Sequence, residues 1–197
     1  MNNLNAVFGI IGTLLGTTLG WLLNQFSSKG KLRIYLANWE DRLTHHDNYG
    51  SVSDINSVDE LQFYSYKCSL DIYNSSAEPR IMRDVHIVFK NKKELLLSSV
   101  PLDEETLHRG PLSYYDEITP VTICAKSAVR IKIRNSEQSG EGKDSFIWKT
   151  KKIYLTYRNE KNRVKRVLIH EEDYSKRLDK YTKEEAGNGK TENAQPE

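Results

Sequence analysis

Cysteine is scarce in this sequence, and the common catalytic and cofactor-binding motifs are missing from it. Only 2 of the 197 residues are cysteine, which excludes a disulfide scaffold and a multi-cysteine zinc module. The sequence contains no G-x-x-x-x-G-K-[ST], G-x-G-x-x-G, C-x-x-C, H-E-x-x-H or G-x-S-x-G pattern. We therefore expect a protein that is not an enzyme and that binds no cofactor.

Charge is missing from the first 28 residues, although the whole chain holds 29 basic and 27 acidic residues. The run AVFGIIGTLLGTTLGWLL occupies residues 6–23. As a helix, these 18 residues reach roughly 27 Å, close to the roughly 30 Å thickness of a membrane's hydrocarbon core. Trp21 suits an aromatic anchor at one interface. We predict a transmembrane helix over residues 6–26, with residues 1–5 as a short non-cytoplasmic head.

A cleaved signal peptide is the competing interpretation of this run. Such a peptide has a basic first region and small residues at its cleavage site, and neither pattern is present here. Lys29, Lys31 and Arg33 follow the run directly, and positive residues next to a span stay on the cytoplasmic side. We therefore expect a retained single-pass span in the cell membrane, a tether over residues 27–30, and a cytoplasmic C-terminal domain.

Glycine recurs within the span at a helical interval. At 100° per residue, the glycines and two threonines fall within an arc of about 140°. In lipid, a face of small residues lets two helices approach closely. The alternative is that glycine is simply common in membrane spans. We predict a homo-oligomer that forms through Gly9, Gly12, Thr13, Gly16, Thr17 and Gly20.

Apolar and polar residues alternate through much of the segment from residue 31 to residue 169. This alternation is typical of half-buried strands, and it predicts strands over 31–39, 61–73, 81–90, 94–100, 120–124, 128–134, 152–158 and 163–169. Residues 159–162 supply the turn of a hairpin between the last two. No strong helical period occurs in this segment. We predict an all-β antiparallel sandwich over 31–169, with immunoglobulin-like topology as one candidate.

The end of the chain has a different pattern. Tyr174, Leu178 and Tyr181 recur at helical spacing among charged residues, which predicts a short amphipathic helix over 170–186. We expect this stripe to dock on the sandwich or on a partner protein of unknown identity. Residues 187–197 are polar and are predicted to be disordered.

Basic residues gather in the last predicted hairpin. Residues 149–169 hold eight Lys and Arg against Glu160 alone. Each Lys or Arg near an anionic membrane surface gains roughly 1 kcal/mol. We expect a contact with the lipid bilayer and its anionic lipids through Lys149, Lys151, Lys152, Arg158, Lys161, Arg163, Lys165 and Arg166. A solvated sheet face is the simpler alternative, and the net charge of only +2 disfavours nucleic acid, for which Tyr154 and Tyr157 would be the stacking residues.

Three further features invite a functional interpretation that their context disfavours. His45-His46-Asp47 lies in a predicted polar loop near Glu40 and Asp41, but no second cluster completes a metal shell. Asn74-Ser75-Ser76 matches the glycosylation sequon, although residues 74–79 are also typical of a turn. Cys68 lies on the same side of a predicted strand as Tyr66, Leu70 and Ile72 and is expected to be a small core side chain. We expect no metal and a turn after Asn74.

Three hypotheses of function follow. The leading one is a membrane-anchored β-sandwich that acts as an interaction or sensing module, associates with itself through its span and catalyses nothing. The alternative is a membrane-disrupting effector of the toxin or defence type, whose glycine-faced helix oligomerises on a signal from the cytoplasmic domain. Expression toxicity that disappears on deletion of residues 1–26 would favour the effector. The third is an enzyme that uses the segment 45–47.

Overall fold

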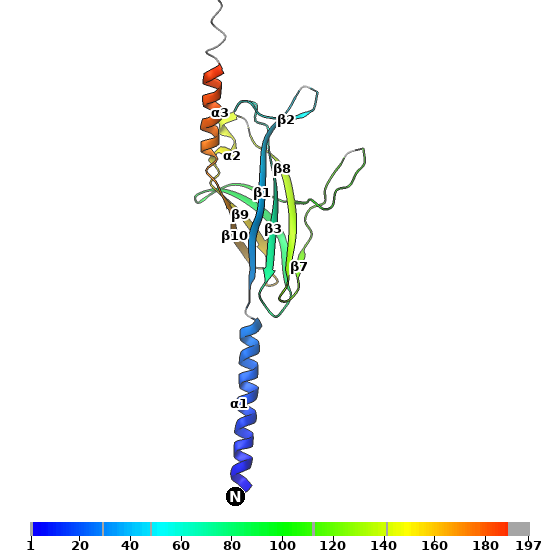
Figure 1. Cartoon of the computed structure of the whole chain (residues 1–197), viewed down its shortest axis with the longest axis vertical. Helices are drawn as coiled ribbons and strands as arrows, with labels where there is room; N and C mark the ends of the chain where they lie inside the picture. The colour runs from blue at the N-terminus through cyan, green and yellow to red at the C-terminus, as the bar shows by residue number, and fades with distance from the viewer. Residues whose placement is uncertain (1, 29, 48, 112, 141, 189–197) are drawn as a thin grey trace, which may run out of the picture.

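The computed structural model describes residues 2–28, 30–47, 49–111, 113–140 and 142–188. Helix α1 (Asn2–Ser28) leaves one end of a β-sandwich, and helix α3 (Ser175–Asn188) lies at the opposite end (Figure 1). The elements between them are β1 (Leu32–His46), β2 (Val52–Asp54), β3 (Phe63–Asn74), β4 (Arg80–Asn91), β5 (Glu94–Ser99), β6 (Leu102–Asp103), β7 (Val121–Ile123), β8 (Ala128–Gln138), the 3-10 turn η1 (Gly142–Asp144), α2 (Phe146–Lys149), β9 (Lys152–Arg158) and β10 (Val164–Glu171).

Two antiparallel sheets form the sandwich. One has the strand order β2-β1-β3-β8-β6, and the other has the order β10-β9-β4-β5, with β7 paired to β4. The pairings among the described strands are all antiparallel. The predicted fold class is therefore confirmed: an N-terminal apolar helix, an all-β antiparallel sandwich and a short C-terminal helix.

Alternate residues of the central strands fill the space between the sheets. In β3, the side chains of Tyr64, Tyr66, Cys68, Leu70 and Ile72 are buried, while the residues between them are more exposed. Successive side chains of a strand point to opposite faces, so this pattern turns one face of β3 toward the second sheet. Residues of β4 and β9 meet it there and complete a single core.

The described side chains of helix α1 contribute nothing to this core. Its described side chains, residues 7–26, are all exposed. The segment Val7–Phe26 is long and apolar enough to span a membrane, with a mean hydropathy of 1.5. The helix continues to Ser28, so the first two residues of the expected tether at 27–30 are helical.

Strand β1 is longer than predicted, and the expected loop around His45 is wrong. The strand runs to His46 because residues 40–44 pair with β3 and residues 44–46 pair with β2. Thr44 lies opposite Phe63 of β3 and also opposite Asp54 of β2. This backbone pairing does not depend on alternating side chains, so the polar residues of this stretch showed no strand pattern.

A short helix lies where none was expected. Helix α2 covers only four residues, and the Oγ of Ser145 caps it by accepting a hydrogen bond from the Ile147 amide at 3.3 Å. Its own residues Ile147 and Trp148 are buried. One helical turn is too short to produce a periodic pattern, which is why the sequence indicated no helix here.

The C-terminal boundaries also differ from the prediction. Strand β10 continues to Glu171, so α3 begins at Ser175 rather than at residue 170. The helix runs to Asn188, past the expected boundary at 186. The predicted disorder of residues 189–197 lies outside the described residues.

Candidate functional site

The junction between α1 and the sandwich is held by the turn that follows β3. The Lys31 amide donates to the Ser75 Oγ at 3.0 Å, and the Ser75 amide donates to the Lys31 carbonyl at 3.2 Å. A Cβ on Gly30 would lie 2.3 Å from the backbone nitrogen of Ser76, so only glycine permits this approach. These contacts therefore hold the turn after β3 against Gly30 and Lys31, the second and third residues after the end of α1.

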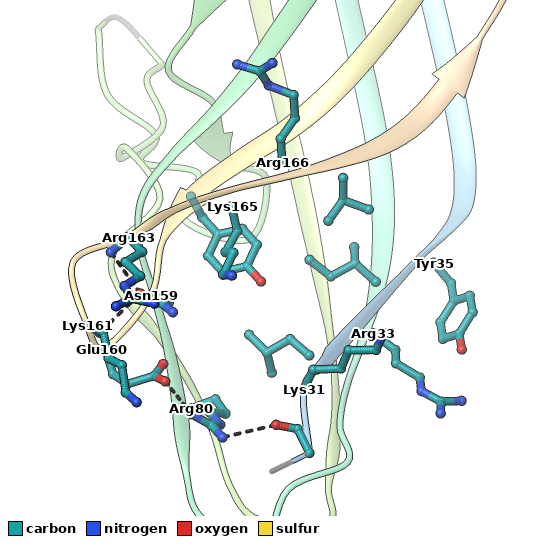
Figure 2. Close-up of a pocket in the computed structure, with 15 residues that line it drawn as sticks. Lys31, Arg33, Tyr35, Arg80, Asn159, Glu160, Lys161, Arg163, Lys165 and Arg166 are labelled. Carbon is teal, nitrogen blue, oxygen red and sulfur yellow. Dashed lines mark hydrogen bonds and ion pairs between the residues drawn. The ribbon is translucent and has the colours of Figure 1, made fainter.

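Arg80 connects this junction to the β9–β10 hairpin. Its guanidinium donates to the Gly30 carbonyl at 3.1 Å and forms an ion pair with Glu160 in the hairpin turn (Figure 2). The Arg80 side chain is only 17% exposed. The start of β1, the start of β4 and the tip of the hairpin are thus tied together at the end of the molecule that meets α1.

A basic groove of about 590 Å³ lies between the start of β1 and this hairpin. Its apolar part consists of Leu32, Ile34, Val167 and the buried Tyr157. Seven cationic residues and a single carboxylate, that of Glu160, line it, so the lining carries six more positive than negative groups. The cationic residues are Lys31, Arg33, Arg80, Lys161, Arg163, Lys165 and Arg166.

The eight basic residues predicted as one surface divide into two groups. Lys149, Lys151, Lys152 and Arg158 form ion pairs with Asp144, Asp173, Glu171 and Asp84 respectively. Lys161, Arg163, Lys165 and Arg166 form no ion pair with the described carboxylates, and all four line the groove. The predicted surface is therefore split between paired cations and cations free to meet an anion.

The three paired lysines lie apart in space from the unpaired cations, whereas the paired Arg158 lies beside the hairpin turn, opposite Val164. The hairpin register places Lys152 opposite Glu171 at one end, whereas the 159–162 turn closes the other end. The three lysines Lys149, Lys151 and Lys152 are thus near α2 and α3, away from α1 (Figure 1). Arg166 extends away from the other labelled cations (Figure 2) and lies 5.9 Å from the ring centre of Tyr154.

Lys31 and Arg33 line the groove, although the sequence indicated only that they orient the span. They are about 130 residues from the hairpin in the chain, and no local pattern connects the two segments. Arg80 and its pairing with Glu160 were missed for the same reason. Tyr157, one of the two stacking candidates, is 6% exposed and is unsuited to stack on a nucleic-acid base.

The glycine stripe of α1 is open along its length. A Cβ added at Gly9, Gly12, Gly16 or Gly20 would meet nothing within 4 Å. The Thr13 hydroxyl donates to the Gly9 carbonyl at 2.9 Å, and the Thr17 hydroxyl donates to the Thr13 carbonyl at 3.0 Å. Both hydroxyl protons are thus used within the helix, and the oxygens remain available as acceptors.

The three tail residues lie against the sandwich. Tyr174 is fully buried, and Leu178 and Tyr181 are partly buried against the core. The Tyr174 hydroxyl donates to the Asp41 carboxylate of β1 at 2.6 Å, and Arg177 donates to the same carboxylate at 2.9 Å. Burial, followed by the charge of Asp41, raises the pKa of Tyr174, so the hydroxyl stays protonated as a donor.

The histidines and cysteines offer little chemistry. No group of three or more His, Cys, Asp or Glu able to hold a metal occurs in the described part of the chain. Both cysteines are free thiols. Burial raises the pKa of the Cys68 thiol to about 12, so it is a small core side chain, as predicted, while Cys124 is exposed.

The architecture defines an immunoglobulin-like β-sandwich that follows an exposed apolar helix. Residues 30–170 match the model of the YopI Ig-like domain, and the chain belongs to that family. It is 25% identical over 179 residues to the SPbeta prophage-derived uncharacterized protein YopI of Bacillus subtilis (strain 168), across 87% of this chain and 99% of that protein. The crystal structure of the putative ApaA protein from Bordetella pertussis is also similar, with 11% identity, a TM-score of 0.35 and coverage of 73% of this chain and 91% of that one.

Proposed function

We propose that this protein is a single-pass membrane protein whose Ig-like sandwich is a cytoplasmic interaction or sensing module, with no catalytic role. The exposure of α1 carries the proposal. Twenty residues of mean hydropathy 1.5 are exposed along this helix rather than buried in the sandwich. Exposed apolar surface of this extent is unfavourable in water, and a bilayer removes that cost for a helix of this length.

The position of the free cations supports the cytoplasmic orientation. Lys31 and Arg33 lie at the junction with α1, and the unpaired hairpin cations line the same groove. Basic residues next to a span favour the cytoplasmic side, and the cytoplasmic leaflet carries the anionic lipids. The orientation that retains Lys31 and Arg33 in the cytoplasm therefore also brings the groove to an anionic surface.

Self-association through the glycine stripe is the second part of the proposal. The stripe offers open backbone surface at Gly9, Gly12, Gly16 and Gly20, and a facing helix can approach it closely. The sandwich follows the span after a junction fixed at Gly30, so helix association brings two sandwiches close together on one membrane surface. A sensing or interaction module gains from such a pair, because two linked sites bind a divalent partner more tightly than one.

The test compares Gly16→Ile with Leu15→Ile in the full chain. Gly16 is central to the stripe, whereas Leu15 lies about 100° around the helix, where one apolar side chain replaces another. We expect energy transfer between labelled copies to fall at least fivefold in Gly16→Ile and less than twofold in Leu15→Ile. The reason is that the van der Waals attraction between facing helices weakens steeply once a small gap separates them.

Resistance of both variants to alkaline extraction from membranes serves as the control for insertion. Equal loss of energy transfer in both would contradict self-association through the stripe. Extraction of the unmodified protein from membranes would contradict the anchoring itself.

A further inference from the structure

We infer that the basic groove at the α1 end of the sandwich binds the headgroup of an anionic membrane phospholipid. This inference rests on the proposed membrane anchoring and deepens it, because it names the ligand class of one site. The groove combines positive charge, an apolar floor and a place next to the end of α1. The rest of the described surface does not combine these three features.

The charge of the groove is available to a ligand. Lys31, Arg33, Lys161, Arg163 and Lys165 are exposed and form no ion pair with the described residues. The one carboxylate, that of Glu160, is already paired with Arg80. Elsewhere on the same hairpin, outside the groove, each cation has an acidic partner. An unpaired cluster of this kind favours a group whose negative charge is shared by two or more oxygens, such as a phosphate.

The shape suits a lipid better than a soluble phosphate. The apolar part of the groove, Leu32, Ile34 and Val167, is only partly buried beneath the cationic rim. A free phosphate has no apolar portion to cover these side chains, whereas the glycerol and first methylenes of a phospholipid do. Burial of apolar surface contributes roughly 25 cal/mol per Å². A volume of about 590 Å³ accommodates a headgroup with its glycerol.

The place of the groove next to the end of α1 matches the depth of the lipid headgroups. Gly30 and Lys31 line the groove, and α1 ends at Ser28. Gly30 lies four positions beyond the segment Val7–Phe26 and therefore at the depth of the headgroups, since the bilayer is about 40–45 Å thick overall around its roughly 30 Å core. Arg80 and the turn at Ser75 hold the groove to this point of the chain, so its opening stays next to the lipid surface.

The experiment measures lipid binding to the full-length protein in a neutral detergent by native mass spectrometry. The probes are dihexanoyl phosphatidylglycerol, dihexanoyl phosphatidylcholine and glycerol 3-phosphate. The double variant Lys161→Gln/Lys165→Gln removes two groove cations. The matched control, Lys149→Gln/Lys152→Gln, removes the same charge from α2 and from the far end of the hairpin, and both of these lysines are paired. Unchanged thermal unfolding of the sandwich shows that each variant folds.

We expect phosphatidylglycerol to bind at least tenfold more tightly than either other probe. The groove variant should bind it roughly 30-fold more weakly, because two cations contribute about 1 kcal/mol each, and the control variant should differ less than threefold. Equal affinity for the two lipids, equal losses in the two variants, or glycerol 3-phosphate binding as tightly as the lipid would overturn the inference. Because the measurement is made in detergent, its failure is distinct from a failure of anchoring, which appears as release of the protein on alkaline extraction.

Discussion

At the scale of single residues, Asn74 closes the turn that holds the junction in place. Its side-chain amide donates to the carbonyls of Glu78, Ile123 and Cys124 at 2.8–3.1 Å, and its Oδ1 accepts from Ser76 at 2.6 and 2.9 Å. The residue is fully buried. The predicted turn is confirmed, and the amide nitrogen of the sequon is already committed to the fold.

The substitution Asn74→Asp should therefore destabilise the sandwich strongly. It keeps the volume but turns a donor into a buried anion that faces three carbonyl oxygens. We expect a loss of about 3 kcal/mol or more in the free energy of unfolding, measured by urea denaturation. Asn162→Asp is the matched control, because Asn162 is exposed in the hairpin turn at φ 56°, a conformation that Asp also tolerates. Equal stability of the two variants would contradict this role.

The sequence allowed the turn at Asn74 to be predicted, but not what the turn holds. Asn and Ser in this spacing indicate a turn through local hydrogen bonds. The close approach of Gly30 to Ser76 and the link from Arg80 to Glu160 join segments 46 and 80 residues apart. No periodicity connects such segments, so these contacts required the structure.

At the scale of elements, α3 is held by a buried polar cluster as well as by its apolar stripe. The hydroxyls of Tyr64 and Tyr174 and the guanidinium of Arg177 all meet the Asp41 carboxylate, whose side chain is 7% exposed. A helix of this length is marginal without tertiary contacts. We therefore expect the hydrogen bonds of this cluster to keep α3 packed against the sandwich.

Tyr174→Phe should loosen α3 without unfolding the sandwich. It removes the 2.6 Å hydrogen bond to Asp41 and leaves part of a buried carboxylate unpaired, which costs about 2 kcal/mol. We expect amide exchange over residues 175–182 to accelerate roughly 30-fold, with exchange in β3 and β8 unchanged. Tyr49→Phe, at a residue 95% exposed, should change neither. Unaltered exchange in α3 would show that the apolar contacts alone hold the helix.

Strand alternation made most of the sandwich predictable from sequence, and the exceptions have a common cause. The apolar stripe of the C-terminal helix could be predicted because its residues recur at the spacing of one helix face, namely Tyr174, Leu178 and Tyr181. The second half of β1 was missed because its polar side chains do not alternate, although its backbone pairs first with β3 and then with β2. Asp41 lies beyond the predicted strand over 31–39, so the sequence did not indicate its place in the buried cluster.

At the scale of the whole molecule, the two ends of the sandwich carry different groups. The end next to α1 carries the groove with its unpaired cations, and the opposite end carries α2, α3 and the paired lysines. In the sequence, the unpaired cations and the paired lysines follow one another closely, and they were therefore predicted to form one surface. The strand register separates them, since a hairpin places its turn and its open end a full strand length apart.

The accessible thiol of Cys124 tests the central claim, which is that α1 spans the membrane with the sandwich in the cytoplasm. Cys124 is exposed and Cys68 is buried, so the native chain carries one reactive probe on the sandwich. The variant Asn3→Cys/Cys124→Ser carries a probe on the head instead. An impermeant maleimide is applied to intact cells and to permeabilised cells.

We expect Cys124 to be labelled only after permeabilisation, and the thiol introduced in the head variant to be labelled in intact cells. The reason is that the basic junction and the groove both favour that orientation. Labelling of Cys124 in intact cells would show that the sandwich lies outside the cell, and the groove would then not face the cytoplasmic leaflet. A head that is labelled only after permeabilisation, together with the sandwich, would mean that α1 does not cross the membrane.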